Sequence, residues 1–240
     1  LSDVLLPLLL IQLLCIIVRN RIQVIHAHQR LPILAAAIIG KITGCQSVGT
    51  VHGQTRYDLK HVVSRKWINH LIFVNKYTLQ SAGSLFPIAG KSVYIPNPAY
   101  TNTQSSHCGN AQDLESPRIC LAGRLSKSFI KLAYPFSREV LPAVLEQHPG
   151  LKLLIVGDDH KLKNRPCMHP CVQFMGFHKD ITECFEGNML VLGSGRVAME
   201  AASAGIPVFL ITRNRMGGLM SFEKYFQVRH TNFVDCTGGE

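Results

Sequence analysis

Residues 190–211 constrain the fold more than any other part of the chain. The segment begins with an apolar run, passes through Gly-Ser-Gly into a stretch of helix-forming residues, and leaves that stretch at Gly205 and Pro207. A second apolar run, residues 207–211, follows at once. A strand, a glycine turn, a helix and a second strand in such close succession predict a β-α-β unit, and such a unit requires a parallel sheet.

The same alternation of short apolar strands and helical stretches fills the rest of the 240-residue chain and is interrupted once, by a segment rich in Ser, Thr, Asn and Gln. We therefore predict α/β architecture with two Rossmann-like parallel-sheet units: an N-terminal unit over residues 1–97, a linker over 98–117 and a C-terminal unit over 118–240. Strands are expected at residues 23–27, 47–51, 71–74, 91–95, 118–121, 151–156, 172–175, 189–192, 207–211 and 232–234.

The formal net charge of +10 favours anionic partners. The basic residues are scattered, and aromatic residues make up only 8% of the chain and do not interleave with them. This pattern argues against nucleic acid and for small anionic ligands. None of the eight cysteines forms a Cys-x-x-Cys pair. We therefore expect a reducing compartment, namely the cytoplasm, with the inner face of the plasma membrane as an alternative.

Residues 4–18 form a strongly apolar run that is shorter than the roughly 20 residues of a membrane-spanning helix. We expect a buried helix of the first unit. The alternative is a membrane-associated helix, for which the positive charge of the chain would favour an anionic surface. The chain begins with Leu1 and ends without a closing element. We therefore expect it to be a fragment in which both units are incomplete.

The glycine turn of residues 190–211 is the best candidate for a ligand site. Gly193, Ser194 and Gly195 lie between the strand and the helix. Glycine lets a ligand approach the backbone, and a helix N-terminus offers unpaired N–H groups that suit a phosphate. Arg196 then opens the helix and Glu200 follows one turn later. We interpret both as ligand-binding residues; the alternative is a surface ion pair that contributes only ~0.2–0.5 kcal/mol.

Other strand ends of the C-terminal unit carry glycines or basic residues that could bind a diphosphate: Gly123, Arg124, Lys127, Lys131, Gly157, Gly217 and Gly218. Arginine would bind it as a fork and lysine as a point charge. For the basic residues that follow the strand at 118–121, the alternative is a solvated loop. For residues 157–159 it is an acidic turn, and for Gly217 and Gly218 it is a simple turn in place of a flexible phosphate loop.

Histidines follow two strands of the N-terminal unit. His52 closes the second strand and is expected to face the ligand cleft, while we expect His26 and His28 to point to different sides of the first strand. A zinc site formed by Cys167, His169 and Cys171 with nearby histidines is the weaker interpretation, because this spacing is not that of a structural zinc site. We expect no metal there, and no hydrolase motif is present.

These motifs in this order resemble the GT-B glycosyltransferases of glycosyltransferase family 4. The segments that carry the resemblance are VIHAH, TVHG and VYIPNP, followed by GRL, LLIVGDD, VQFMGF, GSGRVAME and AGIPVFLI. Together they cover the chain from about Val24 to Leu219. The resemblance implies two Rossmann-like domains that face a cleft, and transfer of a sugar from a nucleoside-diphosphate sugar to a glycan or lipid-linked acceptor in cell-envelope or glycoconjugate synthesis.

The resemblance also implies roles for individual residues. Catalysis would involve His52, Arg124 and Glu200, with retention of configuration and no required metal or other cofactor. Arg124 and either Lys127 or Lys131 would bind the diphosphate, although the family's usual lysine position is Phe129 here.

Glu200 matches the second glutamate of the family's E-x7-E motif, which binds the ribose. The first glutamate falls at Leu192, which cannot bind a sugar hydroxyl. Two alternatives to a glycosyltransferase therefore stay open: a nucleotide-sugar epimerase of the same fold, and a truncated, non-catalytic relic.

Overall fold

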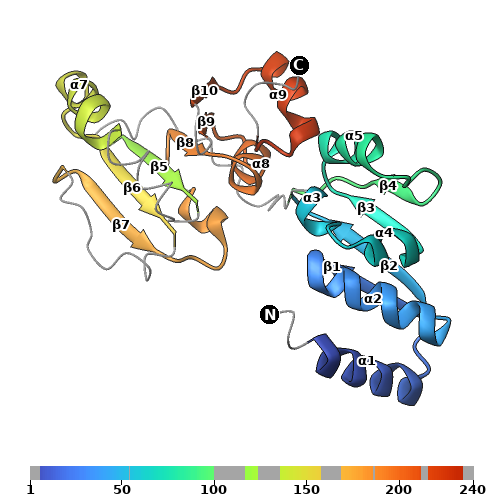
Figure 1. Ribbon diagram of the computed structural model, residues 1–240. Helices are drawn as coiled ribbons and strands as arrows, with labels where there is room; N and C mark the ends of the chain where they lie inside the picture. Colours follow the sequence, from blue (N-terminus) through green and yellow to red (C-terminus); the bar gives the residue numbers. More distant parts are fainter. Residues whose placement is uncertain are drawn as a thin grey trace. The chain divides into compact units, whose positions relative to one another are not determined.

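The computed structural model describes residues 6–53, 55–99, 117–123, 136–157, 169–185, 187–211 and 216–234. The chain divides into two compact units, Leu1–Asn97 and Pro98–Glu240 (Figure 1). Each unit contains one sheet that is mainly parallel. Most of the predicted linker, residues 100–116, lies outside the described residues.

The N-terminal unit is built on four parallel strands in the order β1-β2-β3-β4. All four strands predicted from the sequence are present, with ends shifted by no more than one residue. In chain order the elements are α1 (Leu6–Asn20), β1 (Val24–His28), α2 (Arg30–Thr43), β2 (Gln46–Val51), α3 (Thr55–Asp58), α4 (Val62–Trp67), β3 (His70–Phe73), α5 (Lys76–Leu85) and β4 (Ser92–Tyr94).

Small residues allow α2 to pack closely on this sheet. A Cβ atom at Gly49 of β2 would lie 3.2 Å from Cγ1 of Ile33, and one at Gly40 would lie 2.9 Å from the carbonyl oxygen of Cys45. Ala36 and the neighbouring alanines of α2 are almost completely buried against the strands. The alanine-rich helix and the glycine-bearing strand are therefore complementary, and they fix the carboxyl ends of β1 and β2 side by side.

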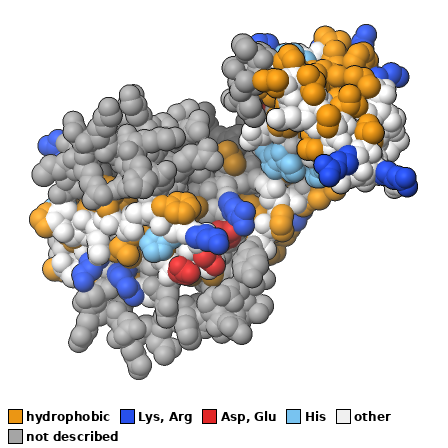
Figure 2. All heavy atoms as spheres, turned by 90° about the horizontal axis from the view of Figure 1, so that it is seen from below, with side chains coloured by type: hydrophobic (Ala, Val, Ile, Leu, Met, Phe, Trp, Pro, Cys, Tyr) orange, Lys and Arg blue, Asp and Glu red, His pale blue; other side chains and the backbone are white. Residues whose placement is uncertain are grey.

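Helix α1 packs on α2 and is not the buried helix that the sequence predicted (Figure 1). Within it only Ile17 is buried, against Ile39 and Cys45, whereas Ile11 and Val18 are 60% and 66% exposed. Figure 2 shows this broad apolar area on the N-terminal unit. Within the described residues, no helix is both long and apolar enough to span a bilayer.

The C-terminal unit contains six strands in the order β10-β9-β8-β5-β6-β7, parallel except for β10, which runs antiparallel to β9. A π-helical turn, Phe136–Val140, leads into α7 (Leu141–Gln147). The other elements are β5 (Arg118–Ala122), β6 (Lys152–Val156), β7 (Val172–Gly176), the 3-10 helix η3 (Ile181–Cys184), β8 (Leu190–Gly193), α8 (Arg196–Ser203), β9 (Val208–Ile211), β10 (Met216–Leu219), α9 (Phe222–Val228) and the 3-10 helix η4 (Arg229–Thr231).

Two sequence expectations for this unit were wrong. Residues 232–234, predicted as a strand, form a turn after η4, because Asn232 and Phe233 both adopt positive φ angles, 53° and 58°, that no strand accommodates. Gly217 and Gly218, predicted as a phosphate loop or a turn, lie in β10, where the pairing with β9 shifts register. Glycine tolerates the φ of +81° at Gly218 that this irregularity requires.

Both faces of this second sheet are covered. In β5, Cys120 and Ala122 face the cluster formed with α8 and α9, while Leu121 between them packs with Leu141 of α7. This alternation is the period of two that a strand imposes on its side chains. The strands are therefore buried on both sides, as expected for a parallel sheet, and only their ends are open to ligands.

Candidate functional site

The strand order of the C-terminal unit locates a crevice at the ends of two neighbouring strands. From β5 the chain continues to β6 and β7 on one side of the sheet, and it returns to form β8 and β9 on the other. Ligands in sheets of this kind bind beyond the carboxyl ends of the strands at which the order reverses. Gly123 follows β5 and Gly193 ends β8, so two of the predicted glycines lie at this point.

The β8–α8 connection has the geometry that its glycines predict. Gly195 has a φ of +59° and precedes α8, and Gly205, with a φ of +75°, follows its end. A Cβ atom at Gly193 would approach Cγ1 of Val197 to 2.7 Å, so only glycine lets the helix begin this close to the strand. No side chain caps α8, and the first amide that bonds back along the helix is that of Met199. The amides of the first turn therefore lack helical partners, as in an anion site.

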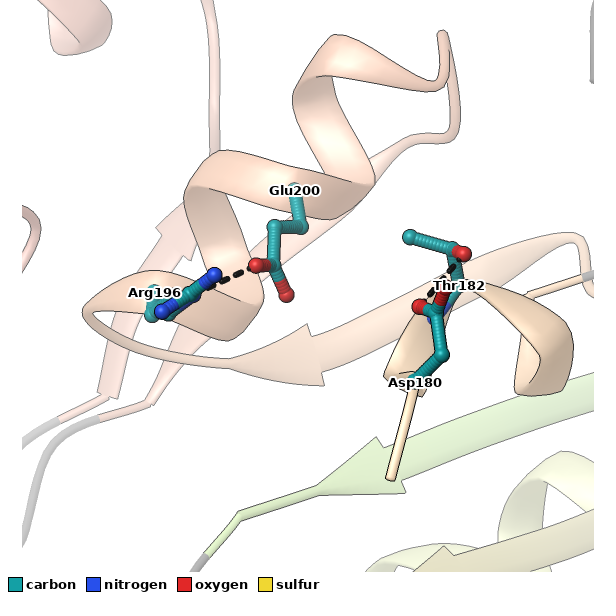
Figure 3. A network of polar contacts seen from close by, with 4 residues as sticks. All are labelled: Asp180, Thr182, Arg196 and Glu200. Carbon is teal, nitrogen blue, oxygen red and sulfur yellow. Dashed lines mark hydrogen bonds and ion pairs between the residues drawn. The ribbon is translucent and has the colours of Figure 1, made fainter. Parts of the chain in front are cut away.

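Arg196 and Glu200 form an ion pair at the start of α8 (Figure 3). The Nε atom of Arg196 donates to Oε1 of Glu200 at 2.6 Å. The Glu200 side chain is only 7% exposed, whereas that of Arg196 is 76% exposed. The pair predicted as the alternative to ligand binding is thus present, but it is not an ordinary surface pair, because a buried carboxylate needs its partner far more than an exposed one does.

Asp180 precedes η3 and lies near the same guanidinium (Figure 3). Its Oδ1 accepts hydrogen bonds from the hydroxyl and the backbone N–H of Thr182, at 2.6 and 2.9 Å. These two bonds lower the pKa of Asp180, and the positive charge of Arg196 lowers it further. Asp180 is therefore a second negative charge in the surroundings of Arg196, without a direct contact between the two in the described residues.

Several predicted glycine amides are already engaged within the protein. The N–H groups of Gly123 and Gly157 donate to the carbonyl oxygens of Val156 and Gly176, at 3.1 and 2.8 Å. These two glycines thus extend the ladder of the sheet, and a ligand could meet them only through close backbone approach.

The amide of Gly195 is engaged as well, by a turn that the sequence did not reveal. Its N–H donates to the carbonyl oxygen of Phe233 at 2.8 Å. The left-handed turn at Asn232 and Phe233 therefore covers the beginning of α8. A positive φ is unfavourable for a bulky residue such as Phe233, so the surrounding structure must enforce it. In the sequence, only Asn232 pointed to this turn, because asparagine tolerates a positive φ.

Leu192 takes no part in this crevice. It is 3% exposed and packs with Leu121, Leu141 and Ile211, on the face of the sheet opposite α8. The position that the resemblance matches to a sugar-binding glutamate is thus a core position here. Arg124, Lys127, Lys131 and Phe129 lie outside the described residues, so their predicted roles stay predictions.

The N-terminal unit gathers three histidines at the ends of β1 and β2. Nδ1 of His28 lies 2.8 Å from Nε2 of His52, and Nε2 of His26 lies 2.7 Å from the hydroxyl oxygen of Thr50. The ring centroids of His26 and His28 are 4.5 Å apart. The expectation that His26 and His28 point to different sides was wrong, because residues two apart on a strand share a face.

Asp58 of α3 holds the turn that carries His52. Its buried carboxylate accepts hydrogen bonds from the backbone N–H groups of Gly53 and His52, and burial nonetheless raises its pKa. Burial and the neighbouring His28 lower the pKa of His52, an effect that the charge of Asp58 opposes. The sequence reasoning missed Asp58, since nothing in Tyr57-Asp58 marks a carboxylate that folds back on the strand end.

The zinc interpretation gains no support from the part of the chain that the structure describes. There, no group of three or more His, Cys, Asp or Glu side chains is arranged to hold a metal. Nδ1 of His169 lies 3.2 Å from Sγ of Cys171, and Cys167 is outside the described residues.

Comparison with known proteins places the α8 site in a wider context. Residues 116–219 match a family model described as Glycosyl transferases group 1, and this range includes Gly193, Arg196 and Glu200. No curated protein matches the sequence.

Three solved structures illustrate the similarity of fold. The Anabaena protein HepE in complex with UDP and glucose has a TM-score of 0.58 at 17% identity, over 83% of this chain and 61% of that one. A glycosyltransferase from Rickettsia africae has a TM-score of 0.56 at 15% identity, over 86% and 62%. The UDP-GlcNAc 2-epimerase from Methanocaldococcus jannaschii has a TM-score of 0.51 at 12% identity, over 83% and 64%. The chain thus spans about three fifths of their lengths, and it has the GT-B fold with two Rossmann-like units.

Proposed function

We propose that the chain is part of a glycosyltransferase that moves a hexosyl group from a nucleoside-diphosphate sugar to a glycan or lipid-linked acceptor, with retention of configuration. The observation that carries the proposal is the buried carboxylate of Glu200 beside an uncapped helix N-terminus, at the point where the strand order reverses. It lies within the range that matches Glycosyl transferases group 1. Such a site suits a ligand that combines phosphate with sugar hydroxyls.

The roles proposed for Arg196 and Glu200 rest on this geometry, and those proposed for Arg124, Lys127 and Lys131 rest on the family resemblance. The first-turn amides of α8 and the exposed guanidinium of Arg196 bind the diphosphate, and Glu200 accepts hydrogen bonds from the ribose. Arg124, with Lys127 or Lys131, stabilises the charge that grows on the leaving diphosphate, so the reaction requires no metal. His52 lines the acceptor side. We assign the enzyme to glycosyltransferase family 4 and to cell-envelope polysaccharide or glycoconjugate synthesis in the cytoplasm.

A nucleotide-sugar epimerase is the second candidate, and the similarity to the UDP-GlcNAc 2-epimerase favours it. An epimerase converts its donor without an acceptor, whereas a transferase needs one. Incubating the full-length protein with donor alone separates the two: a new sugar product without acceptor supports the epimerase, and a product only when an acceptor is added supports the transferase.

Isothermal titration with UDP, GDP and ADP tests the nucleotide site directly. We expect one of them to bind the wild type, and Glu200→Gln to weaken that binding while the protein stays folded. The matched control is Glu146→Gln, which removes the same charge from α7. A wild-type protein that binds none of the three at millimolar concentration would contradict both enzymes and support a non-catalytic relic.

We also propose that the exposed face of α1 contacts an anionic membrane. Ile11 and Val18 present apolar surface there, and the exposed Arg19 and Arg21 follow at the end of the helix. Sedimentation with phosphatidylglycerol vesicles should bring down the protein, and Ile11→Gln should reduce the bound fraction. Val62→Gln, a comparably exposed valine of α4, should not. Equal binding to neutral phosphatidylcholine vesicles would contradict the role of the arginines.

A further inference from the structure

The ion pair at the start of α8 joins two unequal residues. Glu200 is almost completely buried, while most of the Arg196 side chain is in solvent. The contact is made by Nε of Arg196 at 2.6 Å, so the two terminal nitrogens of the guanidinium are not used in the contact with Glu200. One side chain thus reaches from a buried carboxylate to the surface of the proposed diphosphate site.

The two oxygens of Glu200 differ in the same way. Oε1 accepts from Arg196, and Oε2 makes no hydrogen bond with any residue in the described ranges. A carboxylate rotates freely about its last bond unless a partner fixes it. Because Arg196 holds one oxygen, the direction of the other is fixed before a ligand arrives.

The position of Arg196 is otherwise unfavourable. It occupies the first turn of α8, where the helix dipole disfavours a cation. Two carboxylates offset this: Glu200 in direct contact, and Asp180, whose pKa responds to the charge of Arg196. The direct contact with Glu200 thus fixes the guanidinium, and the charge of Asp180 favours a cation there from a greater distance.

We infer that Arg196 is a positioning residue that sets ribose specificity by orienting the Glu200 carboxylate; this inference rests on the proposed nucleotide site. Arg196 holds Oε1, and Oε2 accepts a hydrogen bond from a ribose hydroxyl. Recognition of the ribose therefore depends on Arg196, although Arg196 does not touch the ribose itself. Its effect on the nucleotide is distinct from any contact that its terminal nitrogens make with the diphosphate.

The test compares the binding of a ribonucleotide with that of its 2′-deoxy counterpart. Isothermal titration identifies which of UDP, GDP and ADP binds the wild type, and the same nucleotide is then used in ribo and 2′-deoxy form. We expect the wild type to prefer the ribo form by about 10-fold or more, the range for a hydrogen bond to a charged group. Arg196→Gln and Glu200→Gln should each bring the ratio of the two dissociation constants close to one.

The double variant and two further variants separate positioning from simple charge. Arg196→Gln combined with Glu200→Gln should lower the ratio no further than either change alone, because both break the same contact. Arg196→Lys, which keeps the charge and can reach Glu200, should retain part of the preference. Lys152→Gln removes the same charge from an exposed position at the start of β6 and should leave the ratio unchanged.

The outcomes also distinguish this inference from the proposed function. If Arg196→Gln weakens both forms by the same factor and keeps the wild-type ratio, Arg196 acts only on the diphosphate and the inference is overturned while the nucleotide site stands. If the wild type binds none of the three nucleotides, both are overturned. Thermal melts of each variant confirm that the comparison is made between folded proteins.

Discussion

The two units of the chain use the same kind of sheet but order their strands differently. In the C-terminal unit the order reverses at β5, between β6 and β8, whereas the four described strands of the N-terminal unit follow one another in sequence order. A reversal sends the connections of two adjacent strands to opposite sides and opens a crevice at their carboxyl ends. Glu200 lies at this reversal. The described strands of the N-terminal unit have no reversal, and the histidines of that unit are exposed at the strand ends.

The chemistry of the two strand ends differs accordingly. The C-terminal unit combines a glycine turn, an uncapped helix and a buried carboxylate held by an arginine. The N-terminal unit gathers exposed imidazoles that bond to one another and to Thr50. An anion and a hydroxyl fit the first arrangement, while ring nitrogens that can donate or accept hydrogen bonds suit a polyol such as the proposed acceptor sugar. Under the proposed function, the nucleotide and the acceptor would therefore bind to different sets of residues.

The most direct test of this difference is to remove one polar side chain from each strand end and to measure nucleotide binding. Glu200→Gln should weaken nucleoside-diphosphate binding by about 10- to 100-fold, because a hydrogen bond to a charged group contributes about 1.5–3 kcal/mol. His52→Gln should leave the same affinity unchanged and raise the KM for the acceptor in the full-length enzyme. Titration of both variants with one nucleotide decides the point. Equal loss of nucleotide affinity in both would mean that the imidazoles belong to the nucleotide site.

The glycines at the two strand ends offer a second, smaller contrast. Gly193→Ala brings a Cβ to 2.7 Å from Val197 and should destabilise the C-terminal unit by about 1–3 kcal/mol, as overpacking does. Gly53→Ala meets no atom within 4 Å and should change the free energy of unfolding much less. Urea unfolding followed by circular dichroism measures the loss.

Trp67, the one tryptophan of the chain, lies in α4 and reports on the N-terminal unit by its fluorescence. Its transition should be unchanged in Gly193→Ala. A shift of that transition equal to the shift seen by circular dichroism would show that the two units unfold together, and the contrast between the two glycines would then have to be measured on separated units.

The sequence predicted the features that neighbouring residues determine, and it failed for features that depend on contacts between distant parts of the chain. Local patterns identified β1 to β9 and the β8–α8 turn but not β10, because period-two alternation and glycine at positive φ are properties of neighbouring residues, whereas β10 depends on its pairing with β9. They missed Asp58 and the turn at Asn232 and Phe233, because both act on residues far along the chain or through the backbone. Helix α1 was misjudged as buried because apolar composition does not say what covers a helix.

The smallest effect concerns pH and the histidines. Burial and His28 lower the pKa of His52, with His26 acting in the same direction and Asp58 against it. Between the folded pKa of His52 and about pH 6.5, the unfolded chain therefore binds more protons at this residue than the folded chain does. The stability that His52 contributes is present above about pH 6.5 and is lost as the pH falls through its folded pKa. Acidification also breaks the bond between the rings of His28 and His52, since two imidazolium ions cannot share it.

Thermal melts followed by Trp67 fluorescence at pH 7.5 and 5.5 measure this loss. We expect the melting temperature to fall with pH in the wild type and to fall less in His52→Gln, because that variant has no imidazole to protonate at this position. Asp58 acts in the opposite direction, since burial raises its pKa. The charge of His52 lowers that pKa, so the loss of the imidazole in His52→Gln raises it further and makes the fall in melting temperature smaller still. His70→Gln, an exposed histidine at the start of β3, should keep the wild-type slope. If the melting temperature falls equally with pH in wild type and His52→Gln, the His28–His52 pair adds no pH dependence to the stability. The two strand ends would then differ in shape and charge but not in their response to pH.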